Sequence, residues 1–119
     1  MGGAGERERA AQPEDLGRFF VERANAGDVD GLVALYEAEA VLAFPPGQVT
    51  TGRRAIRQVY ERLLAGKLTF TGEPQPALRN GDLALTSTRL AGGGATVEVA
   101  RRQPDGMWLW VIDQPNILG

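Results

Sequence analysis

The apolar residues of this chain change their spacing once, near Gly66, and that change limits the possible folds more than any other feature. Before Gly66 they recur every three or four residues, and after it they alternate with polar residues. A period near 3.6 is typical of helices, and a period of 2 is typical of half-buried strands. Helices followed by a run of strands predict an α+β fold with an antiparallel sheet.

Three helices are predicted before this change. Pro13 opens the first helix, since proline suits a first helical turn, and Gly27 is a suitable stop. Asp28 caps a second helix, whose apolar stripe extends to Tyr36. Gly52 precedes a third. Short apolar or alternating segments bounded by glycine and proline turns predict five strands, at residues 41–44, 68–72, 78–88, 95–103 and 107–113.

The chain has no histidine and no cysteine, which removes several kinds of site. Without cysteine there is no disulfide, thiolate or zinc–sulfur site. Without histidine, the commonest general base and the commonest transition-metal ligand are missing. No calcium-loop spacing of acids occurs either. We therefore expect no metal and no cofactor.

Charge and length exclude further classes. With 13 basic and 15 acidic residues, and the basic ones only in pairs such as Arg53-Arg54, nucleic-acid binding is not supported. No apolar run is long enough to span a membrane. Residues 1–11 are charged and glycine-rich without an apolar segment, which predicts a disordered leader, not a secretory signal. Residues 12–119 then form a single domain, and we expect a cytoplasmic location.

The last predicted strand has two different faces, because side chains alternate along a strand. One face is aromatic and apolar, formed by Trp108, Trp110 and Ile112. The other is apolar and ends in an acid, and it is formed by Leu109, Val111 and Asp113. Large aromatic residues on a sheet face favour a dimer interface over ligand stacking. The second face then becomes a pocket wall, in which Asp113 either orients a water or ligand or serves as a structural acid.

Glu98 is the second candidate acid. It alternates with Val97 and Val99, which places it on the face opposite to these two valines. If that face is concave, burial would raise the pKa of Glu98 and suit it to acid–base chemistry, whereas on the outer face it would be a solvated acid. Two acids sharing one apolar pocket would push their pKa values apart and divide acid and base roles between them.

The order and spacing of several segments resemble the nuclear-transport-factor-2-like, or SnoaL-like, superfamily, and especially its uncharacterised SgcJ/EcaC-type branch. The resemblance covers about residues 14–116 and rests on residues 26–32, 35–41, 46–47, 52–56 and 101–115. It implies a cystatin-like cone, in which three helices pack in the hollow of a strongly curved antiparallel sheet and a pocket opens at the wide mouth. It also implies a homodimer through the outer sheet face.

Ketosteroid isomerases of this superfamily place an oxyanion-binding tyrosine on the first helix and a catalytic aspartate before the proline of the first strand. The matching positions here are Phe20 and Phe44, which indicates a ketosteroid isomerase-like fold without that chemistry. The resemblance implies that Tyr36, Tyr60 and Glu98 retain polar positions of the pocket. The alternative for both tyrosines is a core position in which each hydroxyl finds one partner.

We predict a small apolar pocket walled by Phe20, Phe44, Leu109 and Val111, with Tyr36, Tyr60, Glu98 and Asp113 as its polar groups. Arg89 is a further candidate, able to neutralise a ligand acid or pair with Glu98, unless it is a surface arginine. The candidate function is cofactor-independent acid–base catalysis by Glu98 and Asp113 on a small apolar ligand: isomerisation, cyclisation or hydrolysis. The alternatives are a non-catalytic ligand-binding protein and a dimerisation module whose cone is filled by its own side chains.

Overall fold

The computed structural model describes residues 7–66 and 69–117. Within them the chain forms three helices and seven strands, and the α+β class predicted from the sequence is confirmed. The helices are α1 (Glu14–Asn25), α2 (Val29–Val33) and α3 (Arg53–Ala65). The strands are β1 (Tyr36–Leu42), β2 (Thr50–Thr51), β3 (Glu73–Pro74), β4 (Leu78–Asn80), β5 (Leu83–Arg89), β6 (Ala95–Arg102) and β7 (Trp108–Gln114).

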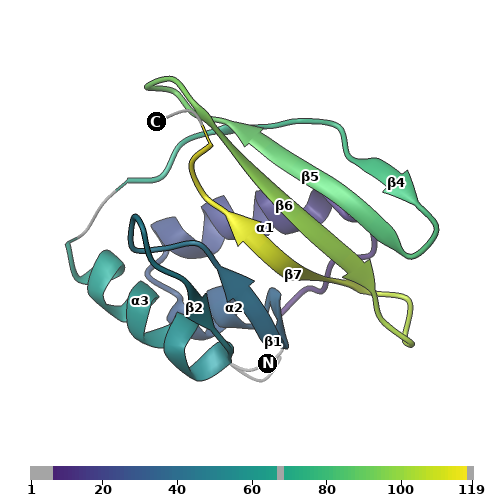
Figure 1. The fold of residues 1–119 in the computed structure, drawn as a ribbon, viewed down its shortest axis with the longest axis horizontal. Coiled ribbons are helices and arrows are strands. Elements are labelled where there is room, and N and C mark those ends of the chain that lie inside the picture. The colour runs from purple at the N-terminus through teal and green to yellow at the C-terminus, as the bar shows by residue number, and fades with distance from the viewer. Residues whose placement is uncertain (1–6, 67–68, 118–119) are drawn as a thin grey trace.

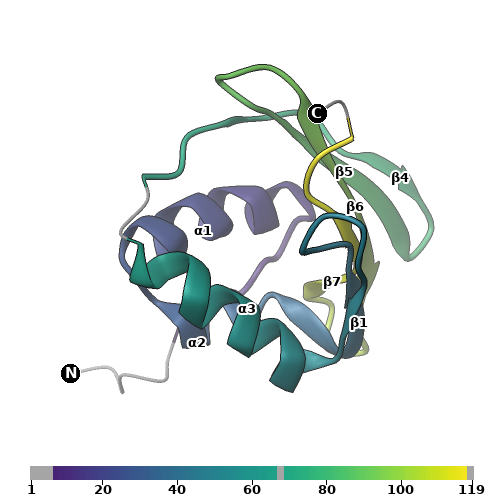
Figure 2. The ribbon, with the colours of Figure 1, turned by 60° about the vertical axis from the view of Figure 1, so that its left-hand side comes forward.

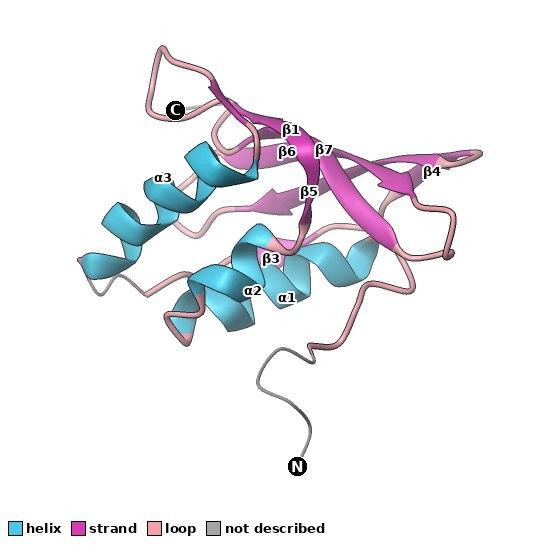
Figure 3. Cartoon of the chain, turned by 90° about the horizontal axis from the view of Figure 1, so that it is seen from below, coloured by secondary structure: helices cyan, strands magenta, loops and turns pink. Residues whose placement is uncertain are grey.

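The strands form one curved sheet in the order β2-β1-β7-β6-β5-β3, of which Figure 1 shows β2 to β5. β4 pairs with β5 on the same edge as β3, but at the other end of the strand. The predicted antiparallel sheet is in fact mixed, because β1 and β7 run parallel while the other pairs are antiparallel. Alternating residues identify a strand but not the direction of its neighbour. The sheet is open, and the three helices lie against its concave face (Figures 2 and 3).

The space between the helices and the sheet is the core. Each layer contributes fully buried side chains, among them Leu16 of α1, Leu32 of α2, Ile56 of α3, Leu42 of β1 and Trp108 of β7. Burial of such side chains supplies the main driving force for folding. The core therefore fixes how the helices sit on the sheet, and with them the residues that both layers direct inward.

The first and third helices lie where the sequence predicted them, but the second is shorter than predicted. It ends at Val33, and Tyr36 is the first residue of β1 instead of a helical residue. The backbone N–H of Trp110 donates to the carbonyl of Leu35 at 2.8 Å, and Tyr36 pairs with Trp110. Pairing with β7 thus overrides the helical spacing of Leu35 and Tyr36.

The strand predicted at residues 68–72 is not formed where the structure describes it, at 69–72, and Leu68 lies outside the described residues. The amide side chain of Asn25 takes the place of a neighbouring strand for Phe70. Its Nδ2 donates to the Phe70 carbonyl at 3.0 Å, and its Oδ1 accepts from the Phe70 N–H at 2.6 Å. The segment is therefore attached to the end of α1 and not to the sheet.

Residues 7–11, which the sequence assigned to a disordered leader, are part of the fold. Ala10 is buried, and its carbonyl accepts from the Trp108 N–H at 2.9 Å. The Arg7 guanidinium donates two hydrogen bonds of 2.7 Å to the Asp28 carboxylate. The sequence prediction missed this because the charged residues of this segment find partners that are distant in sequence. The remainder of the predicted leader, residues 1–6, lies outside the described residues.

Candidate functional site

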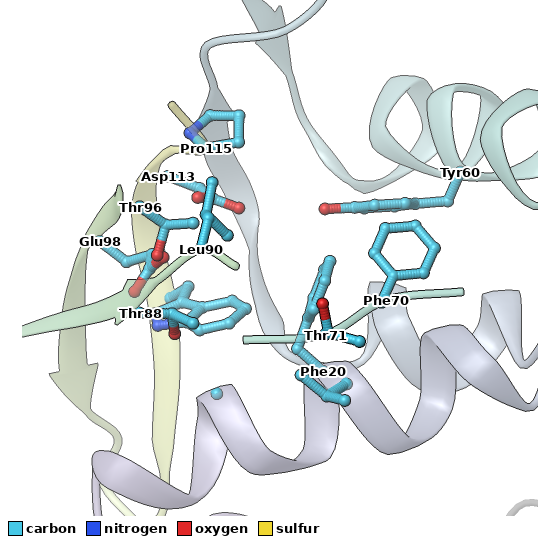
Figure 4. Close-up of a pocket in the computed structure, with 13 residues that line it drawn as sticks. Phe20, Tyr60, Phe70, Thr71, Thr88, Leu90, Thr96, Glu98, Asp113 and Pro115 are labelled. Carbon is cyan, nitrogen blue, oxygen red and sulfur yellow. The ribbon is translucent and has the colours of Figure 1, made fainter. Parts of the chain in front are cut away.

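A cavity of about 240 Å³ lies between α1, α3 and strands β5 to β7 (Figure 4). Its wall is mainly apolar and aromatic, with a small number of hydroxyl and carboxyl groups. The lining residues are Gly17, Phe20, Val21, Tyr60, Phe70, Thr71, Thr88, Leu90, Thr96, Glu98, Trp110, Asp113 and Pro115. Pockets for drug-sized ligands have volumes of roughly 300–1,000 Å³. This one therefore suits a smaller molecule, of about one ring.

A β-bulge in β7 determines which side chains reach this cavity. Ala100 of β6 pairs with Trp110, and Val99 pairs with Ile112, so Val111 has no partner on β6. The extra residue shifts the alternation of β7 by one position. As a result, Trp110 and Asp113 point to the same side although they are three residues apart.

The predicted faces of this strand are therefore wrong. Trp108 and Trp110 are each 2% exposed and belong to the core, so they cannot form a dimer surface. Ile112, at 48% exposure, is the single predicted interface residue that remains on the outer side. Leu109 contributes to a separate hollow beside residues 7–10, and Val111 does not line the cavity.

Asp113 lies at the end of the cavity and is 4% exposed. Its Oδ2 accepts a 2.5 Å hydrogen bond from the Tyr36 hydroxyl, which in turn lies 2.7 Å from the Tyr60 hydroxyl. Burial and, to a smaller extent, the nearby charge of Glu98 raise the pKa of Asp113 to about 7, although the Tyr36 hydrogen bond opposes the shift. Asp113 can therefore both accept and donate a proton near neutral pH.

Glu98 faces the cavity from β6 and is 5% exposed. The Thr86 hydroxyl donates to its Oε1 at 2.6 Å and accepts from the Trp110 indole N–H at 3.1 Å. Burial raises the pKa of Glu98, and the Thr86 hydrogen bond lowers it. This chain of hydrogen bonds holds the carboxyl group in place and connects it to an aromatic ring of the cavity wall.

The two acids are directly opposite each other on neighbouring strands, because Glu98 pairs with Asp113 in the antiparallel β6–β7 ladder. Side chains opposite each other on one face have Cβ atoms roughly 4.5–5.5 Å apart. Both carboxyl groups lie at the same end of the cavity, with Thr96 beside them (Figure 4). Acids this close repel each other when both are ionised, and they therefore titrate as a coupled pair.

The two tyrosines have different positions. Tyr60 lines the cavity, and the edge of its ring meets Phe20 with centroids 5.9 Å apart. Tyr36 is fully buried behind it, and burial together with the negative charge of Asp113 raises its pKa well above the ordinary range. Tyr36 thus supports Asp113 from the core and does not line the cavity.

Phe44 and Arg89 lie away from the cavity, contrary to the prediction. Phe44 belongs to a neighbouring hollow formed with residues 46–48 and 114–116. Arg89 is exposed at the end of β5 and pairs with Glu73 at 3.6 Å. The alternation of side chains along β5 explains the position of Arg89. Thr88 faces the cavity, so Arg89, the next residue, points to the opposite side.

Sequence reasoning also missed several residues of the cavity wall. Phe70 packs edge-to-face on Phe20 with centroids 5.9 Å apart, but it comes from a segment without a clear pattern. Thr88 and Thr96 are a cross-strand pair on β5 and β6. Their alternation with Thr86 and Glu98 was a usable signal, because all four then share one face of the sheet.

The described residues hold no group of three or more acids, histidines or cysteines arranged for a metal ion. No helix among them is long and apolar enough to cross a membrane.

Many solved structures share this fold. A ketosteroid isomerase-like protein from Erwinia carotovora atroseptica SCRI1043 is 16% identical, with 89% of this chain and 94% of that chain covered and a TM-score of 0.73. An NTF2-like protein with a cystatin-like fold from Novosphingobium aromaticivorans is 21% identical. The match covers 88% of this chain and 79% of that chain, with a TM-score of 0.72. A domain of unknown function with a cystatin-like fold from Nostoc punctiforme PCC 73102 is 17% identical. The match covers 89% of this chain and 75% of that chain, with a TM-score of 0.73.

At these identities the likeness shows the fold alone. No curated protein matches the chain. The model of the SnoaL-like domain matches residues 17–117, which is most of the chain and includes every residue that lines the cavity. The chain belongs to the SnoaL-like domain family.

Proposed function

We propose that this protein binds a small, mainly apolar organic molecule in the cavity and that Asp113 transfers a proton to or from it without a cofactor. The observation that carries the proposal is the pairing of Glu98 and Asp113 at one end of an otherwise apolar cavity. An apolar cavity with a few convergent polar groups and perturbed pKa values is the arrangement expected of a ligand site.

Asp113 suits the role of a general base or acid because its pKa of about 7 lies near neutral pH. Its Oδ2 is held by Tyr36, which keeps the carboxyl group in one orientation. Glu98 lies opposite it and disfavours a second negative charge at this end of the cavity. The pair then holds one proton over a range of pH, and Asp113 can exchange it with the ligand.

Isomerisation and cyclisation of a carbonyl compound begin with removal of a proton beside the carbonyl group, and hydrolysis needs a water activated in the same way. All three require one base beside an apolar surface. Phe20 and Phe70 supply that surface, and Tyr60 adds a hydroxyl near it. Proton transfer is therefore the proposed reaction class, and the structure of the ligand determines which of the three reactions follows.

Deuterium exchange tests the proton transfer directly. A panel of small cyclic and aryl ketones would be incubated with the protein in D₂O, and loss of the proton next to the carbonyl would be followed by NMR. We expect exchange whose rate rises with pH through about 7, since the base is the ionised form of Asp113. Replacing Asp113 by Asn should lower the rate by roughly 10²–10⁴-fold.

Glu61→Gln is the matched control, because Glu61 is an exposed acid on α3. It should exchange protons at the rate of the parent. If ketones bind in the cavity but none exchanges faster than in buffer, the catalytic proposal fails and the protein is a non-catalytic binding module. If Asp113→Asn retains the parent rate, Asp113 is not the base.

We also propose that the protein is a homodimer through the outer face of the sheet, over a surface that differs from the predicted one. An apolar row crosses four strands, because Leu78 pairs with Leu85, Leu85 with Val99, and Val99 with Ile112. Leu78, Leu85 and Ile112 are 71%, 44% and 48% exposed. A contiguous apolar row on an open sheet favours association with a second copy.

Sedimentation velocity tests this surface. The parent should have the mass of a dimer, and the double change Leu85→Asp/Ile112→Asp should have the mass of a monomer with an unchanged circular dichroism spectrum. Leu109→Asp, placed at the separate hollow near residues 7–10, is the control and should stay dimeric. A monomeric parent would refute the proposal.

A further inference from the structure

The charges around the cavity do not balance. Glu98 and Asp113 line it, and among the described lining residues there is no arginine or lysine. Buried carboxyl groups are normally paired with a cation or held in the protonated form. At this site no side chain supplies the positive charge, so a proton or a bound ligand has to supply it.

Hydrogen-bond acceptors at the same end of the cavity are also unused. Tyr36 occupies Oδ2 of Asp113, and Thr86 occupies Oε1 of Glu98. Within the described part of the chain, no hydrogen bond of full geometry reaches the other oxygen of either carboxyl group. The buried Thr96 hydroxyl lies close enough to Glu98 to lower the pKa of that acid, but it has no partner at full hydrogen-bond geometry. Three acceptor groups therefore face one small volume. An alkylammonium group has three N–H donors and no acceptor.

The opposite end of the cavity is aromatic. Phe20 contacts Tyr60 and Phe70 at centroid distances of 5.9 Å, and Trp110 at 6.0 Å. Figure 4 shows Tyr60 and Phe70 across the cavity from Glu98, Asp113 and Thr96. A ligand that fills the space therefore has a polar head at the acids and an apolar body between the rings.

We infer that the cavity selects a small amphipathic amine, bound as the ammonium ion with its head at Glu98, Asp113 and Thr96 and its apolar body against Phe20 and Phe70. This inference rests on the proposed function, since it names the class of ligand for the same cavity. The pKa of Asp113 supports it, because a group that retains its proton for lack of a cation should ionise when a cation binds beside it.

Other classes of ligand fit the charges less well. A carboxylate or phosphate would bring a third negative group to two acids without any cation to offset it. A neutral ketone can only accept from a protonated acid, and a neutral alcohol can also donate to an ionised one, but neither brings a positive charge that would offset the ionised acids. The amine alone supplies both the donors and the charge.

A matched series of head groups tests the inference: 2-phenylethylamine, 2-phenylethanol and phenylacetate share one apolar body. Their binding would be measured by isothermal titration calorimetry at about pH 8, where Asp113 is mostly ionised. We expect the amine to bind roughly tenfold or more tightly than the alcohol, and phenylacetate to bind more weakly still. Amine binding at about pH 6 should also release protons, detected with buffers of different ionisation enthalpy.

Glu98→Gln should reduce the affinity for the amine to that for the alcohol and leave the affinity for the alcohol within about twofold, since glutamine keeps the shape of the side chain. The exposed control Glu61→Gln should change neither. The ranking in the unmodified protein does not depend on any variant being folded. If the alcohol binds as tightly as the amine, the inference is overturned while the proposed binding site stands. If none of the three binds, both are overturned.

Discussion

Strands β6 and β7 contribute to two ends of the interior that differ sharply. At one end, Trp108 and Ala100 are buried against the helices in a close-packed core. At the other end, past the bulge at Val111, the same two strands direct Glu98 and Asp113 into a cavity of about 240 Å³. The packed end stabilises the fold by burial of apolar surface, and the open end holds two acids that burial makes costly.

This difference shows how one sheet can serve both stability and function. Buried acids without a cation lower stability once they are ionised, so they persist only where the rest of the core offsets their cost. The core next to the cavity includes two tryptophans and several fully buried aliphatic side chains. We therefore expect changes at the packed end to affect mainly unfolding, and changes at the open end to affect mainly binding and its pH dependence.

The largest effect is expected from Trp108→Ala. Removing this buried indole ring should lower the free energy of unfolding by about 3–5 kcal/mol, because a new cavity forms in the core. Phe20→Ala, in a wall that already faces a cavity, should cost only about 1–2 kcal/mol. Urea denaturation followed by far-UV circular dichroism measures both. Equal costs would refute the contrast between the two ends.

Asp113→Asn should stabilise the protein in a pH-dependent manner. Because the pKa of Asp113 is raised from 3.8 to about 7, the folded state holds the proton more tightly than the unfolded state does. Its contribution is fully favourable below about pH 4 and is lost as the pH rises through 7, with an upper bound on the order of 4 kcal/mol. Asparagine removes that loss, so we expect roughly 1–3 kcal/mol of stabilisation at about pH 8 and none at about pH 4.

Thermal unfolding over this range of pH, with Glu61→Gln as the control, measures the effect. A stabilisation of equal size at both ends of the range would mean that packing, and not the charge of Asp113, is responsible. A destabilisation at about pH 8 would contradict a raised pKa.

The smallest effect is expected from Gly17→Ala, which should separate stability from binding at one residue. Gly17 lies within α1 and lines the cavity, and an added Cβ would meet Thr88 Oγ1 at an ordinary 3.5 Å. Gly17→Ala should stabilise the helix by about 0.5–1 kcal/mol and weaken binding of 2-phenylethylamine roughly tenfold by narrowing the cavity. Calorimetry and thermal unfolding of one sample give both numbers. Loss of stability would show that the methyl group does not fit.

Much of the fold could be predicted from the sequence because it depends on local patterns. Pro13 and Gly52 mark the starts of the first and third helices, and the change of period near Gly66 gives the α+β class. The end of the second helix and the strand expected over the described residues 69–72 were wrong, since pairing with β7 and the Asn25 side chain decided those segments. Such contacts join residues far apart in sequence, and no local spacing predicts them.

The site could be predicted only in part. Alternation on β6 separated Glu98 from Val97 and Val99, and the family resemblance implied a pocket position, which is where the structure has it. Phe20, Tyr60 and Asp113 also line the cavity, whereas Tyr36 lies behind it. The catalytic roles of Glu98 and Asp113 stay predictions.

The class of fold, the absence of histidine and cysteine chemistry, and the presence of two acids among apolar strands all follow from the sequence. The direction in which β7 faces follows only from how the strands pair. One unpaired residue, Val111, shifts the alternation, so that both tryptophans and Asp113 point inward and Ile112 points outward. The reason is physical: side chains alternate with a period of 2, so a single bulge reverses every later position, and only the pairing with β6 fixes where the bulge occurs.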